Sequence, residues 1–224
     1  MDQKSCFLIT GKLIPEYIDG LIYSYKHTDN KIISTWENED QDSINKLKAN
    51  NFIVILNSLK HQNINDFRPI PIVNGINYAK KNGYEYILKS RTDIVSSNFI
   101  EYLKIVQQLY TDKITVISGI ETIDGIYFLD IIVSGKTDDM ENFFTIKYAD
   151  DNRFIEKFVL ESYINKTNLT KVDIRNHIHF SKDLCLKHNI DFIWYRNSSW
   201  KNAIRTIPDM KVINEYCKDT FIWI

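Results

Sequence analysis

The sequence predicts an α/β protein whose N-terminal part forms a mostly parallel β-sheet and whose C-terminal part is mixed. Three continuous apolar runs, at residues 5–10, 31–36 and 52–56, are separated by stretches with helical spacing. Strands buried on both faces read as continuous apolar runs, and their alternation with helices is typical of βαβ units. A fourth apolar run, at 84–89, is followed by polar residues and is expected to complete this sheet.

Spacing and helix-ending residues predict the helices of the N-terminal part. Pro15 suits the first turn of a helix, and apolar residues within 17–25 recur at helical spacing. Residues 37–50 are polar and are predicted to form a loop and a surface helix. A helix is expected to begin near Pro69 or Pro71 and to end at Asn82-Gly83, because glycine commonly follows a helix.

The C-terminal part is expected to mix strands and helices. Ser97 is predicted to cap a helix over 99–110, and Thr137 is predicted to cap another helix. A tight turn at Asp124-Gly125 favours antiparallel or mixed strand pairing nearby. The other expected elements are strands at 114–118, 127–133 and 191–195, and helices at 153–165 and 181–188. Residues from 197 onward show no strong period.

Size and composition are those of one globular domain spanning residues 1–224. The chain is 44% hydrophobic and 25% charged, and it is long enough to fold without a disulfide or a metal. We expect a regular α/β half over about 1–95 and a mixed half over about 96–224. Lys and Arg (28) balance Asp and Glu (29), and no basic run stands out, so the charge pattern does not favour nucleic-acid binding.

Cysteine usage predicts a reducing compartment. Cys6, Cys185 and Cys217 are odd in number and share no spacing typical of a metal site, so three thiols are the simplest account. The first apolar run is too short for a signal peptide or a transmembrane segment. The sequence therefore predicts a cytoplasmic protein, and it leaves open whether partners bring it to the inner face of a membrane.

Polar residues follow the fourth predicted strand, at the place where a parallel sheet binds ligands. Asp93 ends this stretch, and Arg91 precedes it by two residues. A carboxylate suits Mg²⁺ or Mn²⁺, which favour oxygen ligands, and a guanidinium suits phosphate. The plainer alternatives are that Asp93 caps the next turn and that Arg91 pairs with Asp93 or Asp130.

The first two predicted strands also end on candidate binding residues. These residues are Thr10, Gly11, Thr35 and Trp36. A nucleotide base and its ribose would lie beyond such strand ends. Trp36 could stack on a base or a sugar, although tryptophans are more often buried in a core.

Several segments resemble motifs of the WavE lipopolysaccharide-synthesis family. Residues 32–36 (Ile-Ile-Ser-Thr-Trp) resemble its second-strand signature. Residues 68–75, followed by 83–93, resemble its longest motif, in which a helix leads to a strand ending in Lys-x-Arg-Thr-Asp. Weaker matches lie at 128–130 with 135–139 and at 158–164, where Leu160 and Ser162 replace a proline and a glutamine. The similarity spans roughly residues 5–165, and Gly11-Lys12 stands where a Gly-Pro pair is usual.

This resemblance implies a GT-A-like glycosyltransferase that moves a sugar from a nucleotide-diphosphate donor to a glycan acceptor. The acceptor would be a surface polysaccharide or its precursor, including a lipid-linked one. Residues 1–95 would bind the nucleotide sugar, and residues 96–224 would bind the acceptor. In GT-A enzymes an Asp-x-Asp motif closes the fourth strand and holds Mn²⁺ or Mg²⁺ on the diphosphate. Here Arg91-Thr92-Asp93 keeps only the second carboxylate, so Asp93 is the metal-ligand candidate.

The resemblance also suggests residues for donor binding and for proton transfer. Arg68 stands about where a GT-A arginine reaches toward the donor. Glu161 would share a helix face with apolar residues, which would raise its pKa and suit a general base, with Glu156 as a second choice. Asp130 lies within an apolar run and is the other acid expected to have a partner or a substrate.

Some alternatives to these assignments remain open. His177-x-His179 could be part of a metal site, but two histidines are a weak signal because zinc sites usually need three or four ligands. A late histidine could instead complete a GT-A metal site. Gly11-Lys12 is a trace of the glycine-rich basic loop of sugar nucleotidyltransferases. A non-catalytic glycan-binding domain of the same fold is the third possibility, favoured by the lost carboxylate.

Overall fold

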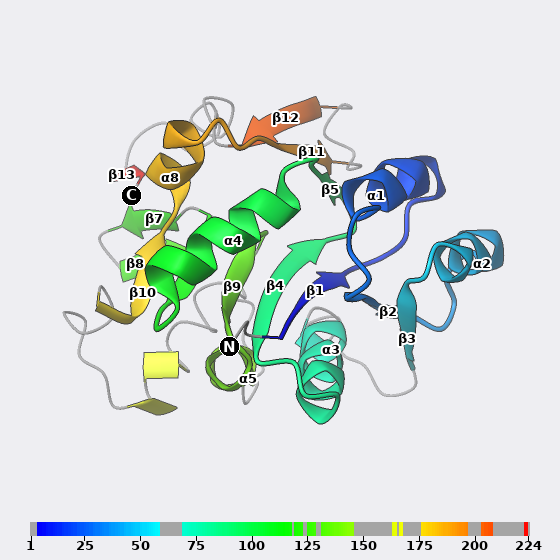
Figure 1. The fold of residues 1–224 in the computed structure, drawn as a ribbon, viewed down its shortest axis with the longest axis horizontal. Helices are drawn as coiled ribbons and strands as arrows, with labels where there is room; N and C mark the ends of the chain where they lie inside the picture. Colours follow the sequence, from blue (N-terminus) through cyan, green and yellow to red (C-terminus); the bar gives the residue numbers. More distant parts are fainter. Residues whose placement is uncertain are drawn as a thin grey trace.

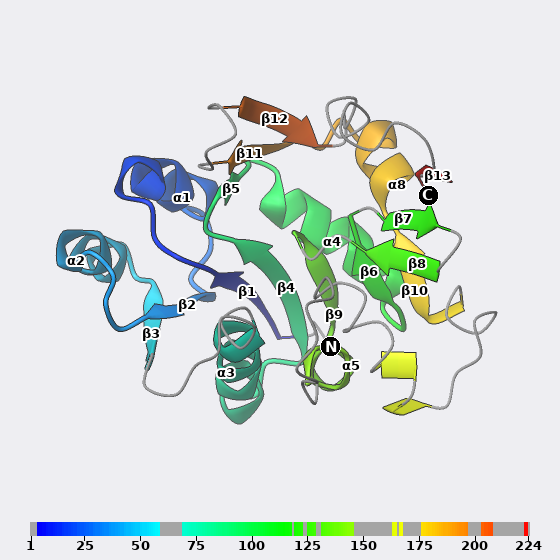
Figure 2. The same cartoon turned by 180° about the vertical axis from the view of Figure 1, so that it is seen from behind.

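The computed structural model describes residues 4–58, 69–117, 119–122, 125–128, 131–145, 163–164, 166–167, 176–196, 203–207 and 222–223 (Figures 1 and 2). The predicted helix over 153–165 lies almost wholly outside these residues. No helix in the described ranges is both long and apolar enough to cross a bilayer.

A seven-stranded, mostly parallel sheet forms the centre of the described structure, with strand order β10-β6-β9-β4-β1-β2-β3. Its strands are β1 (Ser5–Thr10), β2 (Lys31–Trp36), β3 (Ile53–Asn57), β4 (Tyr86–Arg91), β6 (Ile114–Val116), β9 (Val133–Lys136) and β10 (Ile178–Phe180). The first four are parallel to one another and β10 is parallel to β6, whereas β9 runs antiparallel to both β4 and β6. The predicted α/β fold with a mostly parallel N-terminal sheet is confirmed.

Helices cover both faces of this sheet because its apolar residues alternate between them (Figure 1). In β1, Phe7 and Ile9 point to one hydrophobic core, and Cys6 and Leu8 point to the other. The first core is covered by α1 (Ile18–Ser24), α2 (Gln41–Ala49), α4 (Phe99–Tyr110) and α8 (Lys182–Lys187). The second is covered by α3 (Pro69–Lys81) and α5 (Thr137–Phe144). A short 3-10 helix at Pro15–Tyr17 precedes α1.

The fourth strand begins and ends two residues later than the apolar run predicts. Its register with β1 pairs Ser5 with Tyr86 and Thr10 with Arg91. The length of the neighbouring strand therefore fixes the bounds of β4, and its polar last residues remain in the ladder although the apolar pattern has stopped. As a result Arg91 belongs to the strand itself, and the sheet sets the direction of its side chain.

The predicted helix caps at Ser97 and Thr137 are wrong. The N-cap residues of α4 and α5 are Asn98 and Lys136, and neither cap makes a side-chain hydrogen bond. The Thr137 hydroxyl donates instead to the main-chain oxygen of Tyr84 at 2.6 Å. The Thr137 hydroxyl therefore bonds to a residue distant in the sequence and not to the first turn of its own helix, which the sequence pattern could not indicate.

The predicted strand at 127–133 is also wrong, because two separate strands replace it. The first, β8 (Gly125–Phe128), forms an antiparallel hairpin with β7 (Gly119–Thr122), as the Asp124-Gly125 turn predicts. The second is β9. Ile131 and Ile132 lie between the two strands and are buried in a turn, so they imitate strand residues in the apolar pattern.

Two small sheets join segments that are distant in the sequence. The late strand β11 (Phe192–Arg196) pairs with β12 (Ala203–Ile207) and with β5 (Ile94–Val95). A two-residue strand, β13 (Ile222–Trp223), pairs with β7. The sequence predicts β11 but neither β12 nor β13, because Arg205 and Thr206 interrupt the apolar residues of β12 and β13 has only two residues.

Candidate functional site

The carboxyl ends of β1, β2 and β4 meet at one edge of the central sheet, as the sequence predicts. Thr10 pairs with Ser34 of β2 on one side and with Arg91 of β4 on the other. The Thr92 amide donates to the Thr10 carbonyl at 3.1 Å, which continues the contact beyond the strands. The candidates at these strand ends therefore belong to one site, which we call the carboxyl-edge site: Thr10, Gly11, Thr35, Trp36, Arg91 and Asp93.

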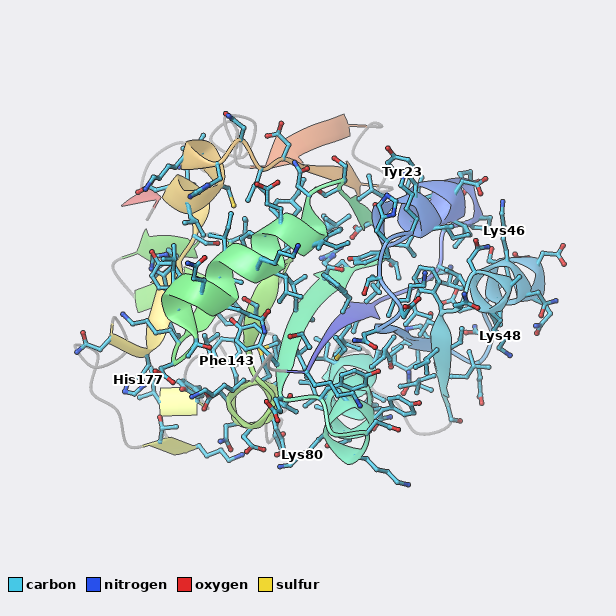
Figure 3. The ribbon with its side chains drawn as sticks, in the orientation of Figure 1. Tyr23, Lys46, Lys48, Lys80, Phe143 and His177 are labelled. Carbon is cyan, nitrogen blue, oxygen red and sulfur yellow. The ribbon has the colours of Figure 1, made fainter. Side chains whose placement is uncertain are left out.

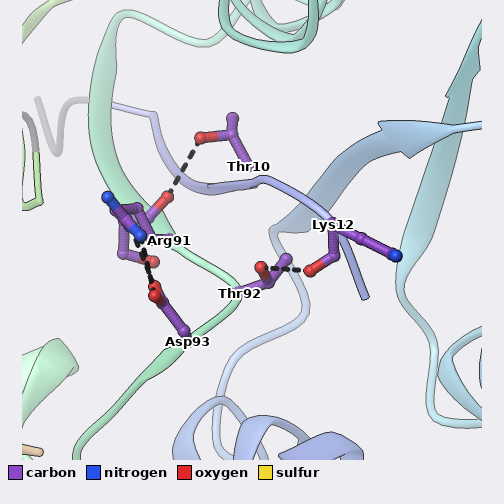
Figure 4. Close-up of polar contacts among 6 residues, drawn as sticks. Thr10, Lys12, Arg91, Thr92 and Asp93 are labelled. Atoms are coloured by element: carbon purple, nitrogen blue, oxygen red, sulfur yellow. Dashed lines mark hydrogen bonds and ion pairs between the residues drawn. The ribbon is translucent and has the colours of Figure 1, made fainter. Parts of the chain in front are cut away.

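A bidentate ion pair joins Arg91 and Asp93 at this edge (Figure 4). Nε of Arg91 donates to Oδ1 of Asp93 at 2.9 Å, and Nη2 donates to Oδ2 at 2.7 Å. The Asp93 side chain is 11% exposed, whereas the Arg91 side chain is 36% exposed. Two parallel charge-assisted bonds fix the guanidinium plane, and they occupy both oxygens of the only acid in the Arg91-Thr92-Asp93 triplet.

The loop after β1 lies against Thr92, the residue between Arg91 and Asp93. Gly11 has φ of +128°, and a Cβ placed on it would lie 2.9 Å from the Thr92 hydroxyl oxygen. That hydroxyl donates to the main-chain oxygen of Lys12 at 2.7 Å (Figure 4). Only glycine combines this φ with so close an approach, so the Gly11-Lys12 loop and the end of β4 are positioned by one another.

Glu39 is a residue at this edge that the sequence patterns do not indicate. The Thr35 hydroxyl lies 2.8 Å from the Gly11 carbonyl oxygen and 3.0 Å from Oε1 of Glu39. The single proton of the Thr35 hydroxyl is shared between these two acceptors, the Gly11 carbonyl and the Glu39 carboxyl. Burial raises the pKa of the Glu39 carboxyl, against the effect of hydrogen bonds from Thr35 and from the main chain of Leu13.

A buried amide ties the ends of β2 and β3 to α3. Nδ2 of Asn57 donates to Oγ of Ser34 at 3.0 Å and to the Thr35 carbonyl at 2.5 Å. Its Oδ1 accepts from Nδ2 of Asn74 at 2.7 Å, and Asn57 is only 2% exposed. In the sequence, this network is marked only by an asparagine at the end of an apolar run.

Two large side chains near the strand ends are buried. Trp36, which ends β2, is 8% exposed, which favours the core role over stacking on a ligand. Lys89 precedes Arg91 by two residues on β4 and is fully buried, with Nζ 5.9 Å from the ring centre of Phe144. A lysine at the end of an otherwise apolar run is the sequence signal that could have indicated this position.

The remaining candidates lie outside the described residues. These are the general-base candidates and the arginine ahead of α3: Asp130, Glu156, Glu161 and Arg68. Their roles stay predictions.

The histidine pair is remote from Asp93, because it lies at β10, the outermost strand on one side of the sheet. His177 precedes β10, which runs parallel to β4 and is separated from it by β9 and β6 (Figure 3). His179 stacks on Tyr110 with ring centres 3.6 Å apart, and burial lowers the pKa of its imidazole. Neither histidine is placed to complete a site at Asp93.

The described residues do not fit the two-carboxylate metal site of the Asp-x-Asp pattern. Among them, no group of three or more His, Cys, Asp or Glu side chains is arranged to hold a metal ion. Asp93 is the one carboxylate of the 91–93 triplet, and both its oxygens accept from Arg91.

A cavity of about 720 Å³ opens at the opposite, amino edge of the parallel strands. Its lining residues include Gly83, Glu85 and Lys136. Lys80 in its wall pairs with Asp138 at 2.9 Å and with Glu141 at 2.5 Å, and Lys136 pairs with Asp112, so both lysines of the cavity wall are engaged with carboxylates. We therefore place the candidate site at the carboxyl edge, where parallel sheets bind ligands.

No family model and no curated protein matches the chain. Solved structures with a similar backbone include a cytidylyltransferase from Leptospira borgpetersenii (16% identity, 75% of this chain and 74% of that chain, TM-score 0.47). Another is a protein described as a nucleotide-diphospho-sugar transferase from Desulfovibrio desulfuricans (14% identity, 79% of this chain and 78% of that chain, TM-score 0.41). A third is a mannose-1-phosphate geranyltransferase from Thermus thermophilus (8% identity, 79% of this chain and 68% of that chain, TM-score 0.45). The fold assignment rests on the strand order above and not on these scores.

Proposed function

We propose that the protein is a GT-A-like glycosyltransferase that moves a sugar from a nucleotide-diphosphate donor to a glycan acceptor. The observation that carries this proposal is the Arg91–Asp93 pair at the shared carboxyl edge of β1, β2 and β4, where a donor diphosphate would bind. The resemblance to the WavE lipopolysaccharide-synthesis family supports a hexosyltransferase acting on a surface polysaccharide or its lipid-linked precursor. Such a role suits a cytoplasmic protein working near the inner face of a membrane.

The transfer breaks the bond between the anomeric carbon and the diphosphate oxygen and forms a bond to an acceptor hydroxyl oxygen. The leaving diphosphate gains negative charge, so a cation fixed at the strand edge stabilises the transition state. The Gly11-Lys12 loop approaches the end of β4 closely and would border the diphosphate. Thr10 and Thr35 would border the nucleoside, with Arg68 approaching the donor from before α3.

Stereochemistry determines whether a general base is needed. In an inverting transfer, Glu161 or Asp130 would accept the proton of the acceptor hydroxyl in a single displacement. In a retaining transfer no such base is required. Mn²⁺ or Mg²⁺ is the cofactor that the resemblance implies, with Asp93 as its ligand. Because the described residues do not fit that site, no step here depends on the metal.

Purified protein and a panel of nucleotide sugars test the proposal. We expect at least one donor to raise the melting temperature and to be slowly hydrolysed, and we expect Asp93→Ala to abolish both effects. Lys46→Met is the matched control because its ion pair with Asp19 lies on the outer helices α1 and α2 (Figure 3). The proposal fails if no donor stabilises or is hydrolysed, with or without Mn²⁺, and Asp93→Ala changes nothing.

A sugar nucleotidyltransferase is the second candidate, and the Gly11-Lys12 loop is the observation that favours it. Gly11 has a positive φ, and Lys12 is exposed directly after β1, as a phosphate-binding loop requires. Release of pyrophosphate from a nucleoside triphosphate and a sugar 1-phosphate would favour this reaction over sugar transfer. Donor binding without turnover for any acceptor would instead favour a non-catalytic glycan-binding domain.

A further inference from the structure

We propose that the Arg91 guanidinium binds the donor diphosphate directly, in the place of a divalent metal, and that Asp93 is a positioning residue for Arg91. This inference rests on the proposed function, because it concerns how the same site holds a nucleoside diphosphate. It departs from the expectation that Asp93 is a metal ligand.

The geometry of the pair carries the first step. Both oxygens of Asp93 accept from Arg91, at 2.9 and 2.7 Å. A divalent cation on those oxygens would lie beside a guanidinium that is always protonated, and two like charges at such a separation repel strongly. The carboxylate is therefore arranged to orient a cation that the chain itself supplies.

The environment of the pair carries the second step. Arg91 is the last residue of β4, and its main chain is held by pairing with Thr10 of β1. Its partner Asp93 is buried, while part of the Arg91 side chain reaches solvent. A rigid, partly exposed guanidinium of this kind suits a diphosphate, whose oxygens accept from parallel N–H groups.

The test measures Kd for UDP, GDP, CDP and dTDP by isothermal titration calorimetry, with EDTA and with Mn²⁺. We expect the tightest ligand to bind in EDTA within about threefold of its Kd in Mn²⁺. Arg91→Met should weaken that ligand about 10- to 100-fold, because it removes a charge-assisted hydrogen bond to phosphate. Arg91→Lys keeps the positive charge but loses the planar guanidinium with its parallel N–H groups, so its affinity should lie between those of Arg91→Met and the wild type. Lys46→Met should bind as the wild type does.

A double-mutant cycle separates the two roles of Asp93. If Asp93 orients Arg91, Asp93→Asn weakens binding equally in EDTA and in Mn²⁺, and adding it to Arg91→Met costs nothing further. If Asp93 is a metal ligand, wild-type binding requires Mn²⁺, Asp93→Asn removes that requirement together with the affinity, and the two substitutions act additively. That second pattern overturns the inference while leaving the proposed function intact. Wild-type protein that binds none of the four nucleotides in either condition overturns both.

Discussion

Replacing Gly11 with alanine should destabilise the protein by about 2–3 kcal/mol. The φ of +128° at Gly11 is outside the regions open to L-residues, and holding alanine there costs about 1–3 kcal/mol. The new methyl would also lie 2.9 Å from the Thr92 hydroxyl, which must move. Moving it weakens the 2.7 Å bond to the Lys12 carbonyl, worth about 1 kcal/mol. The reduced freedom of the unfolded chain offsets about 0.5 kcal/mol of this cost.

Urea denaturation followed by circular dichroism measures this loss, and Gly83→Ala is the matched control. Gly83 also has a positive φ, of +72°, but nothing lies within 4 Å of the position its Cβ would take. Alanine at 83 should therefore cost only about 1 kcal/mol, from backbone strain alone. The difference between the two variants isolates the contact with Thr92.

Thr92→Ala supplies the check on that contact. It removes the hydroxyl that the new methyl would meet, so Gly11→Ala should cost less in the Thr92→Ala background than in the wild type. Equal costs for Gly11→Ala and Gly83→Ala, or no relief in the double variant, would refute the argument that close approach at the carboxyl edge requires glycine.

Three further predictions concern side chains that are partly or fully buried. Because burial raises the pKa of Glu39, its folded form binds the proton more tightly than the unfolded chain does, and the resulting stability is lost as the pH rises through the folded pKa. Glu39→Gln should therefore raise the melting temperature more at pH 7 than at pH 4, and an equal shift at both would contradict this. Asn57→Ala should cost about 2–4 kcal/mol in urea denaturation because it removes three hydrogen bonds from a buried network, and a loss below about 1 kcal/mol would argue against that network. Burial raises the pKa of the Cys6 and Cys185 thiols to about 12, so iodoacetamide at pH 8 should alkylate them, as read by mass spectrometry, only in denatured protein, and rapid labelling of the native protein would show that they are accessible.

The secondary structure of the regular N-terminal half could be predicted because its sequence signals lie within each strand or helix. Continuous apolar runs give β1 and β2 with the observed bounds, and Gly83 ends the helix before β4 with a positive φ. Predictions failed where the structure of a segment depends on contacts with distant parts of the chain. The apolar pair Ile131 and Ile132 imitates a strand because burial in a turn and burial in a sheet select the same residue types.

The composition of the candidate site was readable in part. Strand-end positions indicate Thr10, Arg91 and Asp93, because parallel strands place their carboxyl ends at one edge. Glu39 and Asn57 were missed because nothing in their local sequence distinguishes them from surface polar residues. Their roles come from hydrogen bonds that form only in the folded chain, from Thr35 to Glu39 and from Asn57 to Ser34.

The sequence by itself determined that Arg91 precedes Asp93 by two residues at the end of an apolar strand, and the family resemblance adds that an acid would be expected in place of Arg91. It left open whether Arg91 pairs with Asp93 or with Asp130, because several pairings are compatible with one sequence. Only the tertiary structure decided that Arg91 and Asp93 form a bidentate pair at the strand edge. The physical reason is that β1 fixes the last residue of β4, and the turn that follows brings the carboxylate back to the guanidinium.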